Sequence, residues 1–217
     1  MLERLATYLP ALLGGMATTA MLAALAILIG FAVALGLHLV RLRGPRALRA
    51  GVVVYVSFFR GTPLLVQLLM AFYLPGGFGL DLNPWLAAVA VLGLNSAAFQ
   101  CEILRAGFAA LPRAQIEAAQ AFGFTWRQTL RHIELPQALR LTAPALVSEA
   151  IDIIKGSAVV SVLAIAELMR VGKQLTASSF RPLEVYVAVA LAYLLLTSLV
   201  EWGAAALLRH RATGGAA

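Results

Sequence analysis

Three charged residues inside a long apolar segment are the first candidates for chemistry. Glu149, Asp152 and Lys155 follow one another at intervals of three residues, so on a helix they fall within an arc of about 120°. A charge at membrane depth costs about 2.5–3.5 kcal/mol on insertion scales and must face protein, water or a ligand. We therefore expect this face, with Gly156, to point into the bundle interior. Two interpretations are open: an internal Asp152–Lys155 ion pair with Glu149 capping a neighbouring helix, or a polar lining that also includes Ser157 and meets an ammonium or guanidinium group.

A proline in an earlier apolar segment predicts a broken helix. Pro63 lacks a backbone donor and clashes with the carbonyl four residues earlier, and Gly61 loosens the same turn. Irregular backbone at membrane depth is tolerated where it lines a cavity. The polar groups that such a cavity would expose are Arg60, Thr62 and Gln67. The alternative is a kink that only improves packing.

No catalytic or metal-binding pattern accompanies these residues. Gly172-Lys173 does not complete a G-x-x-x-x-G-K-[ST] loop, because Glu167 stands where the first glycine should be. Neither a G-x-S-x-G elbow nor an H-E-x-x-H pair occurs. The three histidines and the single cysteine, Cys101, do not form a metal-binding pattern. We expect no catalytic residue, no metal and no cofactor on this chain.

Composition places these side chains in a lipid bilayer. Of the 217 residues 61% are hydrophobic and 12% charged, whereas a soluble domain has about half and a quarter. A membrane span needs roughly 20 apolar residues. The predicted fold is one all-α membrane domain over residues 1–217, with five transmembrane helices at about 15–40, 51–74, 85–105, 139–163 and 183–208.

The arginines predict the orientation of these spans. Basic residues in short loops favour the cytoplasmic side. An external N-terminus makes the arginine cluster of residues 41–49, the polar connection 106–137 and the basic residues 209–211 cytoplasmic. The C-terminus is then cytoplasmic and the loop 75–84 external. The net charge of +7 thus serves topology, and we expect no nucleic-acid partner.

The connection 106–137 contains the pattern of a short exposed helix. Pro112 suits its first turn and Gly123 the residue just beyond its end, which predicts about three turns. Ala118 and Ala119 give it low relief, so it could lie in a groove on a partner.

This connection resembles the EAA signature of permease subunits of bacterial ATP-binding cassette (ABC) importers. The resemblance holds at each signature position: Glu117, Ala118, Ala119, Gly123, Ile133, Leu135 and Pro136. The segments 59–67, 102–107 and 135–140 are similar to the polar-amino-acid branch of that family, and the likeness covers about residues 10–208. It implies the type I importer permease fold, with a cytoplasmic coupling helix, in the bacterial inner membrane.

The resemblance also implies a function and a set of partners. The chain would be a transport subunit and not an enzyme, with the signature residues coupling it to a separate ATPase dimer that binds and hydrolyses ATP. An extracytoplasmic binding protein would deliver an amino acid, and two permease chains, identical or related, would pair. A five-span chain with one-sided polar helices needs such a partner to enclose a path through the bilayer.

The chain departs from the family in the region of the predicted substrate path, and its carboxylates there leave two other functions open. The chain departs from the family where Gly156-Ser157-Ala158-Val159 replaces an acidic-Thr-Ser-Leu run, and where Ser148-Glu149 occupies the region of a common asparagine. An ion-coupled secondary amino-acid carrier would use the buried carboxylates to bind its ion. An intramembrane enzyme would use Glu149 and Asp152 as acid and base.

Overall fold

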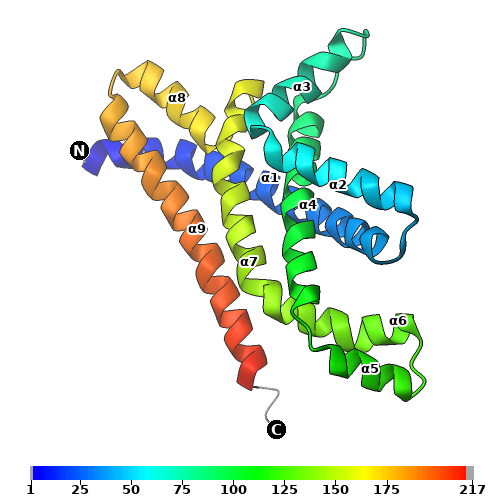
Figure 1. The fold of residues 1–217 in the computed structure, drawn as a ribbon. Helices are drawn as coiled ribbons and strands as arrows, with labels where there is room; N and C mark the ends of the chain where they lie inside the picture. The colour runs from blue at the N-terminus through cyan, green and yellow to red at the C-terminus, as the bar shows by residue number, and fades with distance from the viewer. Residues whose placement is uncertain (1, 214–217) are drawn as a thin grey trace.

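The computed structural model describes residues 2–213, and the side chains of residues 7–208, as an all-helical chain without strands in that range. Figure 1 shows the helices in order of colour. They are α1 (Leu2–Arg43), α2 (Arg46–Gly61), α3 (Leu64–Gly76), α4 (Pro84–Ala109), α5 (Arg113–Ala121), α6 (Trp126–Thr129), α7 (Leu135–Gly156), α8 (Leu168–Ser179) and α9 (Pro182–Thr213), with a π-helical segment Leu130–Glu134 and a 3-10 segment Ser157–Leu163.

The first helix is longer than the sequence predicted. We expected a helix from about residue 15, but α1 begins at Leu2 and runs unbroken to Arg43, with Pro10 inside it. The predicted start was wrong because it was inferred from the thickness of the bilayer. The bilayer limits how many residues can span it, but the hydrogen bonds of a helix can continue beyond the span.

The predicted break in the second apolar segment is present. Thr62 and Pro63 are both extended, with ψ of 146° and 135°, and separate α2 from α3. The two helices meet at 108°, so this segment is a broken span or a re-entrant pair and not one straight helix.

Fewer helices qualify as spans by length and composition than the five that we expected. Within the described residues three do, Thr7–Arg43, Pro84–Ala109 and Pro182–Leu208, and the bent α2–α3 pair makes a possible fourth. α7 is missing from this group; its 22 residues include Arg140, Glu149, Asp152 and Lys155. It also ends at Gly156, and the last residues of the predicted span 139–163 form a 3-10 segment instead of α-helix.

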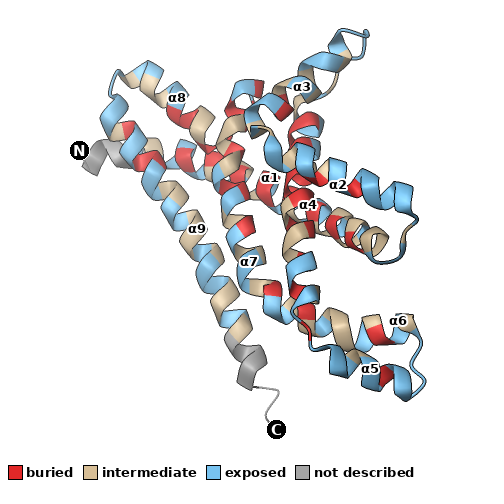
Figure 2. Ribbon diagram, viewed as in Figure 1, coloured by how far each residue is buried: buried red, intermediate tan, exposed pale blue. Residues whose placement is uncertain are grey.

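α4 is the central helix of the bundle. It crosses α1 closely: a Cβ added to Gly30 would lie 3.1 Å from the carbonyl oxygen of Gly93. Figure 2 shows buried residues along α4, the middle of α1 and the upper part of α7, while α5, α6 and the lower part of α9 are largely exposed or half-buried. The core thus sits where α1, α4 and α7 meet, and α5 and α6 project away from it (Figure 1).

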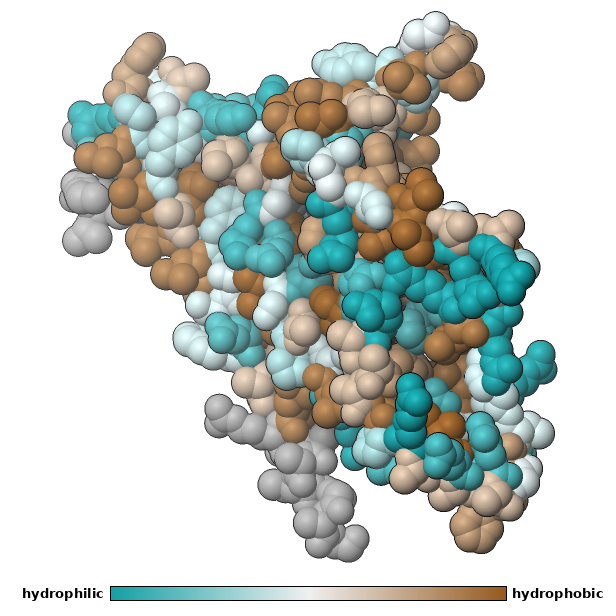
Figure 3. All heavy atoms as spheres, viewed as in Figure 1, coloured by the Kyte–Doolittle hydropathy of each residue, from teal (hydrophilic) through white to brown (hydrophobic). Residues whose placement is uncertain are grey.

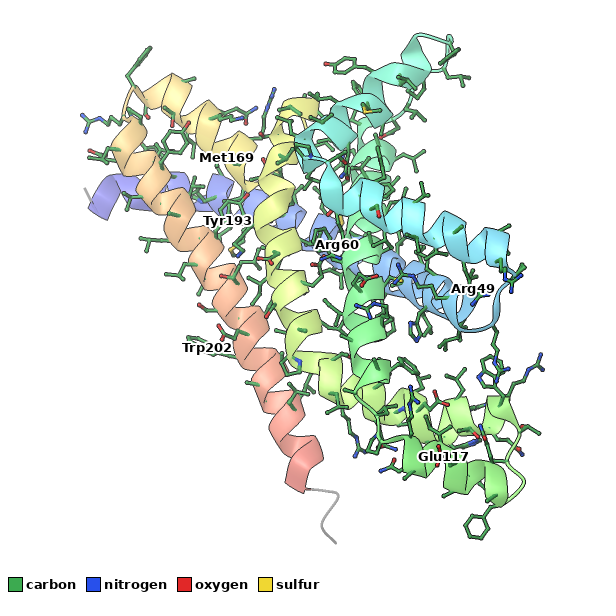
Figure 4. The ribbon with its side chains drawn as sticks, viewed as in Figure 1. Arg49, Arg60, Glu117, Met169, Tyr193 and Trp202 are labelled. Atoms are coloured by element: carbon green, nitrogen blue, oxygen red, sulfur yellow. The ribbon has the colours of Figure 1, made fainter. Side chains whose placement is uncertain are left out.

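Two buried side chains fasten α8 to its neighbours: Glu167 joins it to α9 and Thr19 joins it to α1. Glu167 caps α8 by accepting hydrogen bonds from the backbone N–H groups of Met169, at 2.9 Å, and Arg170, at 2.6 Å. The hydroxyl of Tyr193 on α9 donates to the same carboxylate at 3.1 Å, and Figure 4 labels Tyr193 and Met169 at this junction. Thr19 of α1 accepts from the N–H of Leu168 at 3.1 Å. Burial raises the pKa of the Glu167 carboxyl, and its hydrogen bonds act in the opposite direction.

Candidate functional site

An amide cluster holds the break between α2 and α3. The side-chain N–H₂ of Gln67 donates to the carbonyls of Phe59, at 2.9 Å, and Thr62, at 3.0 Å, and to the Thr62 hydroxyl at 2.8 Å. Asn95 of α4 donates to the Gln67 side-chain oxygen at 3.0 Å and to the Phe59 carbonyl at 3.2 Å. These bonds satisfy the Phe59 carbonyl, for which Pro63 has no N–H, and the Thr62 carbonyl, which lies in the extended break between the helices. Thr62 and Gln67 therefore fix the backbone of the break, and their contact with a substrate stays a prediction.

A second polar chain links α7 through α4 to α1. Glu149 is 8% exposed, and its carboxylate accepts from the Ser96 hydroxyl at 2.9 Å. Gln100 donates to Ser96 at 2.9 Å and to the carbonyl of Ile27 at 3.3 Å. Sequence analysis passed over Asn95, Ser96 and Gln100; the only signal was three uncharged polar residues within one apolar segment.

The charged face of α7 is divided between the bundle and its surface. Asp152 and Lys155 form an ion pair at 2.7 Å, and their side chains are 66% and 57% exposed. We expected these two, like Glu149, to point into the bundle, and only Glu149 does. On a helix Glu149 lies about 60° from Asp152, which is enough to move it from the open face into the contact with α4.

The open face of α7 is a continuous stripe. Leu141, Ala145, Ser148, Asp152 and Lys155 are spaced by four, three, four and three residues, and all five are exposed. Such spacing keeps side chains on one side of a helix. Ser157, by contrast, is fully buried, and its hydroxyl donates to the carbonyl of Ile154 at 2.8 Å.

Arg60 lies beside this stripe. Its guanidinium stands 5.4 Å from the centre of the Phe99 ring on α4. Figure 4 labels Arg60 where α2 approaches α4 and α7, and Arg49 at the far end of α2. The space-filling view of the same face shows a hydrophilic band running from the middle of the molecule toward the N-terminal end of α2 (Figure 3).

α5 is the short exposed helix expected in the connection. Glu117 and Ala118 are exposed, whereas Ala119 is 5% exposed and packs inward. Gly123 follows with a φ of +80°, in the left-handed region that suits glycine at this position. Figure 4 shows Glu117 on the outer edge of the molecule, well away from the bundle.

The remaining signature residues join α5 and α6 to α7. Ile133 lies in the π-helical segment, and Leu135 and Pro136 open α7 directly after it. One side-chain bond closes the loop on itself, from Gln137 of α7 to Gln115 of α5, at 2.8 Å. The connection is therefore continuous with α7 and also hydrogen-bonded to it.

A cation–π contact attaches α6 to the end of α1. The guanidinium of Arg43 lies 5.0 Å from the centre of the Trp126 ring, an arrangement that is attractive by about 0.5–1 kcal/mol at exposed sites. Burial raises the pKa of the nearby Glu134 carboxyl, while the positive charge of Arg43 lowers it.

A half-buried carboxylate forms two ion pairs at the same end of the bundle. Glu102 of α4 accepts from Arg41 of α1 and, at 2.7 Å, from Arg105.

Within residues 2–213 as described, no group of histidine, cysteine, aspartate or glutamate side chains is arranged to hold a metal ion.

Comparison with known proteins identifies the family to which this chain belongs. The model of the family described as "binding-protein-dependent transport system inner membrane component" matches residues 26–212. The L-cystine permease TcyB of Bacillus subtilis is 37% identical over 196 residues, which cover 90% of this chain and 84% of that protein. The arginine permease ArtQ of the same organism is 34% identical over 195 residues, 89% of each.

Solved structures agree with this result. The chain superposes on a chain from the crystal structure of an amino acid ABC transporter with histidines with a TM-score of 0.89 and 32% identity, covering 96% of this chain and 97% of that one. A chain of the MetNI methionine transporter gives a TM-score of 0.79 at 22% identity, which concerns the fold alone.

Proposed function

Because this chain belongs to the family of binding-protein-dependent inner-membrane transport components, and is a multi-pass permease subunit whose ATPase is a separate chain, we propose that it imports amino acids by ATP-driven alternating access. Relatives named for the transport of L-cystine, arginine and glutamine support an amino-acid substrate. In this proposal ATP binds only to the partner ATPase, and the chain itself binds no cofactor.

The observation that carries the proposal is the exposed docking helix. α5 projects from the bundle with Glu117 and Ala118 outward. It is tied to α7 by Gln115–Gln137, and α6 is tied to α1 by Arg43–Trp126. Closure of the ATPase pair around α5 would then move α7 and α1 together, which is the coupling that the signature residues 117–136 would provide.

The proposed substrate path follows the open face of α7. An exposed Asp152–Lys155 pair on a helix inside a membrane protein must be covered by protein or water, since lipid would penalise both charges. A second permease chain, identical or related, would cover this face and enclose the path. Arg60 and Asp152 would border it directly, while Thr62, Gln67, Glu149 and Ser157 would shape it from behind.

An extracytoplasmic binding protein would deliver the amino acid to the outer end of this path. We propose that the N-terminus and the loop 75–84 face outward, and that α5, α6 and the C-terminus face the cytoplasm. This orientation brings the delivery site and the docking helix to opposite sides of the membrane.

The test is reconstitution of the chain with its ATPase and binding protein in proteoliposomes. Radiolabelled amino-acid uptake should require ATP and all three components. Glu117→Arg should abolish uptake and the stimulation of ATP hydrolysis by the binding protein, while the permease still inserts. Glu201→Arg, the same charge reversal on α9, serves as the matched control and should transport normally. Normal uptake by Glu117→Arg would refute docking through α5.

Family membership does not favour the ion-coupled carrier, but the same proteoliposomes separate the two mechanisms. An ABC importer should be inhibited by vanadate and unaffected by a protonophore. A carrier would show the reverse and would transport without the ATPase.

A further inference from the structure

A groove with two arginines in its wall lies between three helices. Its volume is about 620 Å³, and it is formed by the C-terminal end of α2, the second half of α4 and the first half of α7. The groove extends to Ala110, just before α5. It therefore reaches from the level of the α2–α3 break to the turn between α4 and α5.

The wall of the groove carries an excess of positive charge. Its charged residues are Arg60, Glu102 and Arg105. Glu102 is already engaged by Arg41 as well as by Arg105, so its negative charge is shared between two guanidinium groups. Arg60 forms no ion pair with any residue that the structure describes, and its guanidinium only rests over Phe99.

We infer that this groove binds the carboxylate of the transported molecule on its way to the cytoplasm, between Arg60 and Arg105. The inference rests on the proposed function, because a free carboxylate is the group that all amino acids share. Arginine binds carboxylates through two parallel N–H donors. Glu102 is a positioning residue here: its bond with Arg105 holds that guanidinium at the wall, and its bond with Arg41 keeps Glu102 itself in place.

The stripe on α7 connects this groove to the rest of the path. Leu141 and Ala145 line the groove, and Asp152 follows on the same face, about 10 Å beyond Ala145 at 1.5 Å per residue. The path thus has an ion pair at its outer part and an uncompensated positive charge at its inner part. Arg60 is exposed and, among the described residues, its guanidinium makes only the cation–π contact with Phe99, so its N–H donors are free to meet a ligand carboxylate.

The first measurement is the charge selectivity of the groove in the permease–ATPase complex. Ala106 and Ala145 are exposed groove residues, and cysteines introduced there can be modified by an anionic methanethiosulfonate (sulfonatoethyl) or a cationic one (trimethylammonium-ethyl). The ratio of the anionic to the cationic rate should be higher, on the order of tenfold, in Ala106→Cys than in Ala177→Cys on α8. The unsubstituted chain gives the background, because its single cysteine, Cys101, is buried.

Second substitutions assign the selectivity to particular arginines. Arg60→Gln or Arg105→Gln, added to Ala106→Cys, should bring the rate ratio close to that of Ala177→Cys. Arg49→Gln, on the same helix as Arg60 but outside the groove, should leave the ratio unchanged. Equal ratios in Ala106→Cys and Ala177→Cys, or a ratio insensitive to Arg60→Gln, would overturn the inference.

The last arm identifies the anion. In nanodiscs of zwitterionic phosphatidylcholine, L-arginine at millimolar concentration should slow modification of Ala106→Cys, whereas agmatine, which lacks only the carboxylate, should not. Equal effects of the two molecules, no effect of either, or protection that needs phosphatidylglycerol in the nanodisc would each overturn carboxylate binding. ATP-driven uptake by the unsubstituted complex is measured separately, so failure of this inference and failure of the proposed function are distinguishable.

Discussion

The side-chain amide of Gln67 forms hydrogen bonds through both of its polar atoms. Its nitrogen donates to Phe59 and Thr62 at the end of α2, and its oxygen accepts from Asn95 of α4. Gln67→Leu keeps the side-chain volume similar but removes these bonds. The Thr62 carbonyl then loses its side-chain donor, which should cost about 1–3 kcal/mol. We expect a lower unfolding midpoint for the detergent-solubilised complex, measured by differential scanning fluorimetry.

The exposed Gln174 on α8 supplies the control for that measurement. Gln174→Leu makes the same chemical change where no hydrogen bond is lost, and its midpoint should match that of the unsubstituted chain. Equal midpoints for Gln67→Leu and Gln174→Leu would show that the amide cluster does not stabilise the break.

Residue types alone predicted the existence of the break but not the way in which it is held. Pro63 predicts the missing hydrogen bond, because a proline disrupts the helical turn in which it lies. Asn95 lies more than 30 positions after Pro63, in an apolar helix. The sequence around Asn95 does not predict that its side chain will face Phe59 and Gln67. The same holds for Ser96, whose partnership with Glu149 arises only when α4 and α7 pack.

At the level of the helices, α4 and α7 are tightly packed against each other at Gly107. A Cβ added there would clash with the side-chain methyl of Thr142 and come within 3.2 Å of the carbonyl oxygen of Ala138. Gly107→Ala should therefore overpack the crossing by about 1–3 kcal/mol and lower the unfolding midpoint.

Thr142→Ser offers a specific rescue of that variant. It removes the clashing methyl and retains a hydroxyl that can still donate to the carbonyl of Ala138, as Thr142 does at 2.8 Å. The double variant Gly107→Ala/Thr142→Ser should regain most of the lost midpoint. A double variant no more stable than Gly107→Ala alone would place the strain elsewhere in the crossing.

The turn after α5 depends on the backbone freedom of Gly123. With a φ of +80° and no atom within 4 Å of an added Cβ, a side chain here meets conformational strain and not a steric clash with a neighbour. Gly123→Ala should raise the free energy of this turn by about 1–2 kcal/mol and shift α5 relative to α6. We expect lower ATP-driven uptake with little change in global stability.

Gly51 in α2 is the matched control for this substitution. It also has open space around an added Cβ, but its φ is not positive, so Gly51→Ala should preserve uptake and gain up to about 1 kcal/mol from helix propensity. Equal uptake in the two variants would contradict a role for the turn in coupling.

Helix boundaries show why part of the fold escaped sequence analysis. α5 was predictable, because Pro112 and Gly123 mark both of its ends. α7 was predicted only in part: it continues from the connection 106–137 through a π-helical segment and gives way to a 3-10 segment after Gly156. Pro136 lies in its first turn, but the 3-10 segment that follows α7 is closed by Ala164, with a φ of +60°, a residue type that rarely adopts that conformation.

For the molecule as a whole, the proposed orientation can be read from two exposed positions. In intact cells expressing the full complex, a membrane-impermeant maleimide should label Asp81→Cys, in the loop before α4, and not Ala114→Cys on α5. Both should react after the membrane is permeabilised. The opposite pattern in intact cells would invert the topology and contradict docking of α5 to a cytoplasmic ATPase.

The open stripe on α7 has a consequence for the half-life of this protein in the cell. A permease chain that has not yet found its partner presents Asp152 and Lys155 to the hydrocarbon of the bilayer or to water that must enter it. Both situations are costly, so we expect membrane proteases to degrade the unpartnered chain. Subunit stoichiometry would then be enforced after synthesis: the half-life of this chain should shorten when its partner permease is depleted, and lengthen when the stripe is made apolar.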